Sequence, residues 1–107
     1  MKITFFGDVM CEPPILKASK KKDGSYNFDC VFEKVRPMFE ESDYVVTNME
    51  FPLGGEEAKY TDSFFVFNSP DEFAKSVKNA VIDLVSTVNN HTFDRGLQGM
   101  LRTIRAR

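Results

Sequence analysis

Three short β-prone runs, separated by long stretches with helical character, constrain this chain more than any other feature. The runs span residues 3–6, 44–47 and 81–86, and each is rich in β-branched or other apolar side chains. Parallel strands need crossover connections of about a dozen residues or more, whereas a hairpin needs only a few. The spacing therefore predicts an α/β fold in the order β, α, β, α, β, α around a mainly parallel sheet.

Apolar spacing between the first two runs predicts a helix over residues 29–41. Four apolar side chains recur at intervals that place them on one helical face: Phe28, Phe32, Val35 and Phe39. Pro37 lies inside this pattern, and a proline ring removes a backbone donor and crowds the preceding turn. A kink or a restart of the helix is therefore expected at Pro37.

The segment before this helix, residues 11–27, is predicted to be a long loop with room for one short helical turn. It combines Pro13-Pro14 and Asp23-Gly24-Ser25, which break regular structure, with a cluster of solvated charge. The cluster consists of Lys17, Lys20, Lys21 and Lys22.

Two further helices are predicted in the second half of the chain. Ser69-Pro70-Asp71-Glu72 has the residue types of a capping box, so a helix should run over residues 70–79. A last amphipathic helix follows from apolar side chains at i, i+3, i+4 and i+7: Leu97, Met100, Leu101 and Ile104. Asp94 is expected to cap that helix. A brief extended piece is expected at residues 64–67.

Length and charge exclude several classes of protein. The 107 residues suit one domain, so residues 1–107 are taken as a single domain. The net charge of −2 disfavours nucleic acid as a partner. No apolar run approaches the roughly 18 residues of a membrane span, and Asp8 interrupts any signal peptide, so a cytoplasmic location is expected. Cys11 and Cys30 are then expected to be free thiols.

Polar side chains follow all three predicted strands. Asp8 ends the first strand, Asn48 and Glu50 follow the second, and Asn90 and His91 follow the third. The carboxyl ends of parallel strands share one edge, where open α/β sheets bind their ligands. Two carboxylates, an amide oxygen and an imidazole suit a divalent metal. The sequence therefore predicts a metal or ligand site at this edge.

Three motifs in this order resemble those of a known bacterial family. They are Gly7-Asp8-Val9-Met10, Asn48-Met49-Glu50-Phe51-Pro52-Leu53 and Asn89-Asn90-His91-Thr92-Phe93-Asp94-Arg95-Gly96. The combination is similar to the capsule-synthesis and poly-γ-glutamate-synthesis proteins of the CapA type, relatives of the calcineurin-like metallophosphoesterases. Phe67-Asn68-Ser69-Pro70, before the second predicted helix, also resembles a short sequence motif of that family. The resemblance implies the N-terminal half of a metallophosphoesterase-like α/β sandwich, and so an incomplete domain.

The resemblance also implies a dinuclear site for divalent metals such as Mn, Mg, Zn or Fe. Asp8 is then a ligand of the first metal, Glu50 stands at the bridging carboxylate, and Asn90 gives its amide oxygen to the second metal. His91 takes the place of a general acid or transition-state stabiliser. Two metals so placed activate a water and clamp a phosphoryl group, so the implied ligand is a phosphoester.

Two departures from the superfamily limit the activity expected of these residues alone. Met10 stands where the phosphoesterases have a histidine ligand, and a thioether is a poor ligand for Mn²⁺ or Mg²⁺. The superfamily takes further histidines from its second half, whereas His91 is the single histidine here. We therefore expect a half-site with weak metal affinity and no hydrolysis by the 107-residue chain.

Two expectations concern partners. The alternative to an enzyme is a non-catalytic module of capsule polymer assembly, in which the lysines at 17–22 either contact an anionic polymer or form a solvated loop. Half of a two-sheet sandwich also leaves apolar surface and a sheet edge uncovered, which predicts a homo-oligomer.

Overall fold

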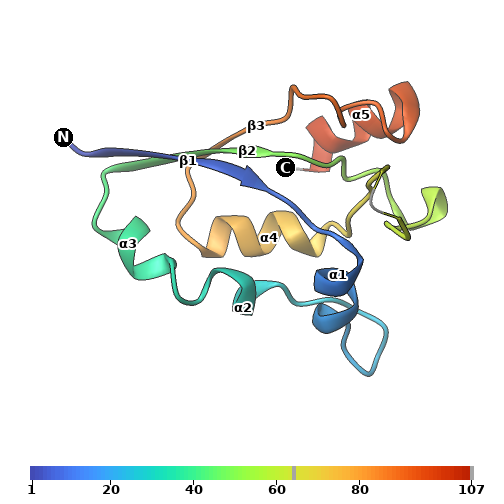
Figure 1. Cartoon of the computed structure of the whole chain (residues 1–107), viewed down its shortest axis with the longest axis horizontal. Helices are drawn as coiled ribbons and strands as arrows, with labels where there is room; N and C mark the ends of the chain where they lie inside the picture. Colours follow the sequence, from blue (N-terminus) through green and yellow to red (C-terminus); the bar gives the residue numbers. More distant parts are fainter. Residues whose placement is uncertain (64, 107) are drawn as a thin grey trace.

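The computed structural model describes residues 1–63 and 65–106 and contains a three-stranded parallel sheet (Figure 1). The strands are β1 Ile3–Val9, β2 Tyr44–Met49 and β3 Leu84–Ser86, in the spatial order β1-β2-β3. Both neighbouring pairs run parallel. The predicted α/β fold is therefore confirmed.

Helices connect the strands, and three of them lie along one face of the sheet. The helices are α1 Pro13–Ser19, α2 Asp29–Phe32, α3 Arg36–Glu40, α4 Glu72–Asn79 and α5 Gly96–Ala106, with a short 3-10 helix, η1 Glu56–Ala58. Figure 1 shows α2, α3 and α4 together on one side of the strands. Within residues 1–63 and 65–106, no helix has both the length and the apolar character that crossing a membrane requires.

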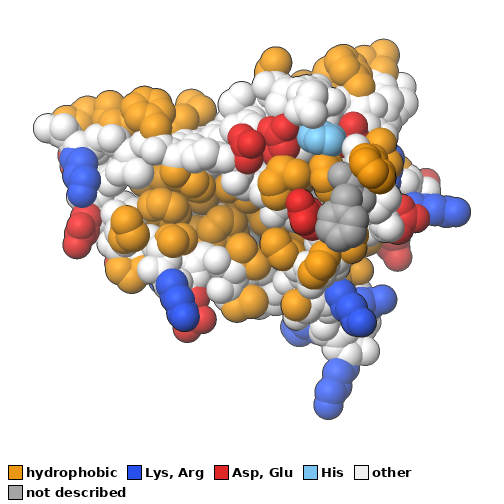
Figure 2. Space-filling view, viewed as in Figure 1, with side chains coloured by type: hydrophobic (Ala, Val, Ile, Leu, Met, Phe, Trp, Pro, Cys, Tyr) orange, Lys and Arg blue, Asp and Glu red, His pale blue; other side chains and the backbone are white. Residues whose placement is uncertain are grey.

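The alternation of side chains in the sheet shows which face is covered. Val45, Thr47 and Met49 of β2 are buried on the helix side. The other face carries an apolar group, called here the open sheet face: Ile3, Phe5, Tyr44 and Leu84. Phe5 is 73% exposed, and Figure 2 shows hydrophobic side chains at the surface along the strands. Because parallel sheets normally bury both faces, this surface lacks the cover such a sheet usually has.

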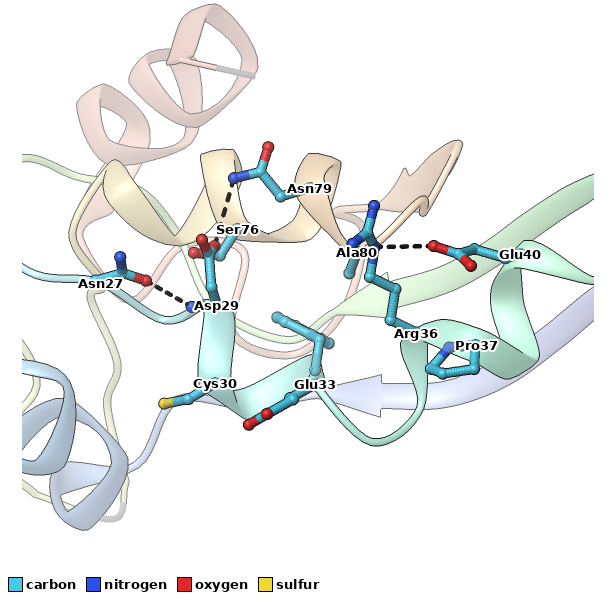
Figure 3. A pocket seen from close by; sticks show the side chains of 11 residues that line it. Asn27, Asp29, Cys30, Glu33, Arg36, Pro37, Glu40, Ser76, Asn79 and Ala80 are labelled. Atoms are coloured by element: carbon cyan, nitrogen blue, oxygen red, sulfur yellow. Dashed lines mark hydrogen bonds and ion pairs between the residues drawn. The ribbon is translucent and has the colours of Figure 1, made fainter.

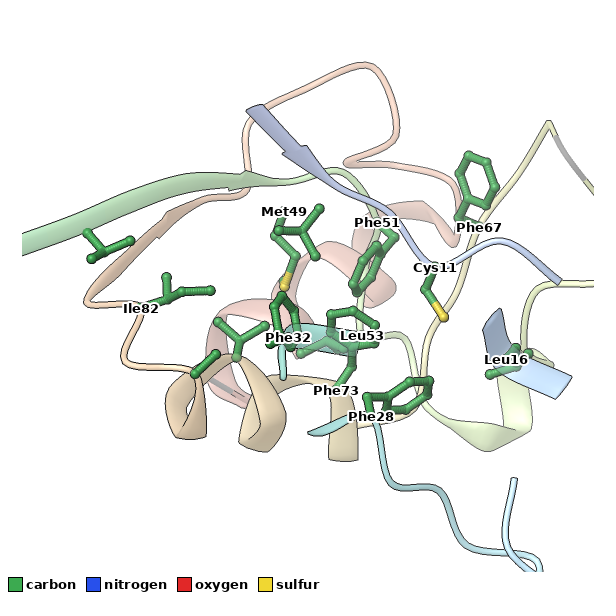
Figure 4. Close-up of a cluster of buried hydrophobic side chains, with 14 of the residues drawn as sticks. Cys11, Leu16, Phe28, Phe32, Met49, Phe51, Leu53, Phe67, Phe73 and Ile82 are labelled. Atoms are coloured by element: carbon green, nitrogen blue, oxygen red, sulfur yellow. The ribbon is translucent and has the colours of Figure 1, made fainter. Parts of the chain in front are cut away.

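Aromatic rings form the centre of the core (Figure 4). Phe73 of α4 is fully buried, and its ring centroid lies 4.6 Å from that of Phe28, 4.8 Å from Phe51 and 5.9 Å from Phe32. Tilted and edge-on pairs of this kind contribute about 0.5–1.5 kcal/mol each beyond the burial of area. Phe28, Phe32 and Phe39, from the predicted helical stripe, are all buried as expected.

The helix predicted over residues 29–41 restarts, as Pro37 indicated. α2 ends at Phe32, and a separate helix, α3, begins at Arg36 with Pro37 in its first turn. A proline is tolerated there because the first amides of a helix have no partner inside it. Val35, the remaining residue of the stripe, precedes α3 as its N-cap and is 38% exposed.

Two predicted boundaries before β3 are wrong. Residues 11–27 contain α1, a seven-residue helix that is longer than the single turn expected and has prolines at its start. α4 begins at Glu72 and the predicted capping box does not form. The Ser69 hydroxyl has no hydrogen-bond partner among the described residues, and Glu72 Oε2 accepts instead from the Tyr26 amide at 3.0 Å. The Glu72 side chain therefore binds a backbone group far away in the chain instead of capping its own helix.

The third strand is shorter than predicted, spanning residues 84–86 rather than 81–86. Val81 has a φ of 67°, in the left-handed region that β-branched residues rarely adopt, so the chain turns there before the strand begins. The extended piece predicted at residues 64–67 includes residue 64, which lies outside the described residues.

Candidate functional site

An extra residue in β1 turns Asp8 toward the side of the sheet away from the helices. Phe5 pairs with Val46 and Asp8 pairs with Asn48, so β1 advances three residues where β2 advances two. A bulge of this kind moves the following side chains to the opposite face. Strict alternation from Phe5 would place Asp8 over the helices. Instead Asp8 is exposed beside Asn48, and Val9 enters the core.

Asn48 joins the two carboxylates that the sequence predicts as metal ligands. Its Nδ2 donates to Asp8 Oδ1 at 2.8 Å and also to Glu50 Oε2. Its Oδ1 accepts from Asn89 Nδ2 at 3.1 Å, and this contact determines which end of the amide faces the carboxylates. The structure therefore brings Asp8 and Glu50 together. The sequence predicts Asn48 at this edge but no role for it.

Of the two asparagines after β3, the network uses Asn89. Its Nδ2 also donates to the Met49 carbonyl at 2.9 Å, and its Oδ1 accepts from the His91 amide at 2.9 Å. Asn90 is exposed, and none of the hydrogen bonds described for this edge involves its side chain. The structure thus links Asn89 to the strand ends, and Asn90, the predicted metal ligand, lies outside this hydrogen-bond network.

The His91 imidazole is held by Asp94 and Phe67. His91 Nδ1 lies 2.6 Å from Asp94 Oδ2, and that oxygen also accepts from the Phe67 amide at 2.7 Å. The Phe67 ring packs edge-on against the imidazole with centroids 4.5 Å apart. The prediction that Asp94 caps α5 is wrong, because its described hydrogen bonds go to these two residues. The side chains of His91 and Asp94 are only 16% and 10% exposed.

This contact selects the tautomer of the imidazole. An ionised carboxylate accepts hydrogen bonds and cannot donate, so Nδ1 carries a proton when it bonds to ionised Asp94. Nε2 is then the nitrogen of His91 available to exchange a proton with a ligand. The arrangement is suited to proton transfer at a single defined atom.

A buried asparagine, to which the sequence analysis gave no role, supports the loop after β2. Asn68 is fully buried, and its Oδ1 accepts from the Gly54 amide at 2.6 Å. Its Nδ2 donates to the carbonyls of Gly55 and Lys59, both at 3.0 Å. A buried amide with its donors and acceptor satisfied holds such a loop in one conformation. The motif at residues 67–70 was the sequence signal for it.

The donors at this edge fit a divalent cation in kind but fall short in number. Asp8 and Glu50 offer the carboxylate oxygens that Mg²⁺ and Mn²⁺ prefer. Within residues 1–63 and 65–106, no group of three or more His, Cys, Asp or Glu side chains is arranged to hold a metal ion. Cys11 adds no ligand, because burial raises the pKa of its thiol to about 11. Cys11 and Cys30 are both free thiols, as expected.

A groove of about 730 Å³ lies elsewhere, between α2, α3 and α4 (Figure 3). It shares no lining residue with the strand-end network. Three of its four charged groups have partners: Arg36 pairs with Glu40 at 3.3 Å, and Asp29 Oδ1 accepts from Asn79 Nδ2 at 3.4 Å, whereas Glu33 makes none of the described ion pairs. Because open α/β sheets bind ligands beyond the carboxyl ends of their strands, we take the strand-end network as the candidate site.

Comparisons with known proteins agree with the motifs. Residues 2–107 match the family described as "Bacterial capsule synthesis protein PGA_cap". The PGA biosynthesis protein CapA of Bacillus subtilis (strain 168) is 30% identical over 105 residues, which are 97% of this chain and 27% of that protein. The capsule biosynthesis protein CapA of Bacillus anthracis is 32% identical over 109 residues, 99% of this chain and 26% of that protein. The chain thus spans about a quarter of the length of these relatives.

Proposed function

The chain belongs to the bacterial capsule synthesis protein family, and on that premise we propose that it forms part of a capsule or poly-γ-glutamate biosynthesis protein whose sheet edge binds a divalent cation. In the longer protein this edge serves the metal-dependent hydrolysis of a phosphoester. Asp8 and Glu50 are its carboxylate ligands from this chain, and His91 is its proton donor.

The observation that carries the proposal is the convergence of two carboxylates on one atom. Asp8 and Glu50 come from different strand ends, and both accept a hydrogen bond from Asn48 Nδ2. Two ionised carboxylates this close repel each other, and a donor or a cation beside them offsets the repulsion. Such a pair is therefore suited to taking up a positive ion.

The oxygen donors favour Mn²⁺ or Mg²⁺ among the metals expected from the sequence, which also include Zn and Fe. Asp8 and Glu50 would hold the ion, and the exposed amide of Asn90 stays the predicted third ligand. When bound, the ion supplies Lewis-acid polarisation of a phosphoryl oxygen. Because the chain contributes only two carboxylates, we expect weak binding.

With both ring nitrogens protonated, His91 is suited to donate its Nε2 proton to a leaving group. Asp94 occupies Nδ1 at 2.6 Å and Phe67 packs against the ring, so the imidazole has one orientation and Nε2 is its reactive nitrogen. His91 is also the single histidine of the chain, so no second imidazole can complete a metal site. We therefore expect no phosphoester hydrolysis by the 107-residue chain alone.

Calorimetry with Mn²⁺ tests the cation site. The wild-type chain should bind Mn²⁺ weakly, and Glu50→Gln should remove the binding because it deletes one of the two charges. Glu57→Gln is the matched control, since Glu57 is an exposed residue of η1 outside the network. Absence of any binding heat at millimolar Mn²⁺, or binding that survives Glu50→Gln, would contradict the proposal. Hydrolysis of a generic phosphodiester by this chain, abolished by His91→Ala, would contradict the inactivity.

A non-catalytic module of capsule polymer assembly is the second candidate. It is favoured by the Asn48 amide, which already satisfies both carboxylates, and by the lack of a third acidic or histidine ligand in the described part of the chain. A longer member of the family assayed for metal-dependent phosphodiester hydrolysis separates the two. Activity lost on replacing the counterpart of Glu50 favours the enzyme, and no hydrolysis with or without added metal favours the module.

A further inference from the structure

Four lysines form a basic surface at one corner of the molecule. This lysine patch consists of Lys17, Lys20, Lys21 and Lys22, all exposed. None of the ion pairs among the described residues includes any of them. Figure 2 shows Lys and Arg side chains gathered where Figure 1, in the same view, places α1 and the loop after it. The patch stands out because the chain as a whole has a net charge of −2.

The backbone that carries the patch is ordered by hydrogen bonds. Lys17 lies in the last turn of α1, and Lys20 forms an antiparallel bridge with Tyr26. The Lys21 amide donates to the Ser25 carbonyl at 2.7 Å, and its own carbonyl accepts from the Gly24 amide at 3.1 Å. The lysines therefore project from a helix end and a closed turn. This order lowers the entropic cost of binding a ligand with several of them at once.

Two carboxylates beside the turn that carries the patch accept hydrogen bonds from other groups. Asp23 Oδ1 accepts from the amide and the hydroxyl of Ser25 at 3.0 and 2.6 Å. These bonds, more than the charge of Lys21, lower the pKa of Asp23. Glu72 Oε2 accepts from the Tyr26 amide. Asp23 offsets part of the charge of Lys21, and none of the four lysines forms an ion pair among the described residues, so positive charge remains on the patch.

The patch also lies on the functional side of the fold. Residues 10–12 alone separate the end of β1 from α1, so α1 starts at the sheet edge that holds Asp8. The patch and the candidate site belong to the same end of the strands.

We propose that the lysine patch binds a polymer that carries one carboxylate on each unit, such as poly-γ-glutamate. The inference rests on the proposed function only for the choice of polymer. Lysines are mobile point charges that suit flexible arrays of carboxylates. Single-stranded nucleic acid would need free aromatic side chains for base stacking. None occurs between Lys17 and Lys22, and the ring of Tyr26, which pairs with Lys20, packs against Phe28 and Tyr60.

Binding of labelled poly-γ-glutamate, followed by fluorescence anisotropy with a chelator present, tests the inference. The test variant replaces all four lysines of the patch by glutamine. The control replaces four other exposed lysines by glutamine, namely Lys2, Lys34, Lys75 and Lys78. Both variants lose the same formal charge, so only the position of the charge differs. Circular dichroism of both variants checks that they fold.

At low ionic strength we expect the test variant to bind at least about tenfold more weakly than the wild type, because each exposed ion pair contributes about twofold or more. The control should bind within about twofold of the wild type, and binding should weaken at about 0.15 M salt. Equal losses in both variants, no binding by the wild type, or tighter binding of a single-stranded oligonucleotide of matched charge would overturn the proposal. Since the chelator removes metal, a failed cation site leaves this result unaffected.

Discussion

Replacing Phe73 by alanine should remove much of the stability of this domain. Phe73 is fully buried, and its ring contacts those of Phe28, Phe51 and Phe32 at centroid distances of 4.6, 4.8 and 5.9 Å. Phe→Ala changes in cores cost about 3–5 kcal/mol, since transfer energy is lost and a cavity is left. The total free energy of unfolding of a domain of this length is roughly 5–15 kcal/mol. The substitution therefore removes about a fifth of the stability at the least, and more than half if the total lies near the lower end of that range.

Urea unfolding followed by circular dichroism measures this loss. With a slope of about 1–3 kcal/mol per molar urea, a loss of about 4 kcal/mol lowers the midpoint by about 1–4 M. Phe65→Ala is the matched control, because the same atoms are removed from a side chain that is 84% exposed and lies outside the open sheet face, and it should change stability by about 0.5 kcal/mol or less. Equal losses for the two variants, or a loss below about 1 kcal/mol for Phe73→Ala, would refute the central place of Phe73 in the core.

Three further predictions concern surfaces and side-chain chemistry. The chain should form a homo-oligomer through the open sheet face, so Phe5→Asp should lower the mass measured by light scattering; a wild-type monomer at tens of micromolar would exclude this. Asp94→Asn should change the tautomer of His91, because the carboxylate that holds Nδ1 is lost; an unchanged long-range ¹H–¹⁵N spectrum would show that the contact does not form. At pH 8, iodoacetamide should label Cys30 and spare Cys11, because burial raises the pKa of Cys11 to about 11 and leaves it protonated; equal labelling of the native protein would disprove the burial.

The order of elements could be predicted from local patterns. Short β-prone runs, long connections and apolar stripes depend on neighbours in the chain, and they indicated the parallel α/β arrangement and the restart at Pro37. The boundaries that failed depend on distant partners. Glu72 accepts from Tyr26 instead of capping its own helix, and Val81 takes a left-handed conformation that nothing in its local sequence indicates.

The sequence by itself determined which polar residues follow each strand, and therefore which ones meet at the carboxyl edge. Only the tertiary structure decided how they are combined. The bulge in β1 puts Asp8 on the same face as Asn48, the turn after β3 selects Asn89 for the network, and Asp94 contacts His91 instead of capping a helix. The physical reason is that strand register and side-chain hydrogen bonds join residues far apart in the chain, so their free energy depends on the folded arrangement and leaves no periodic signal in the sequence.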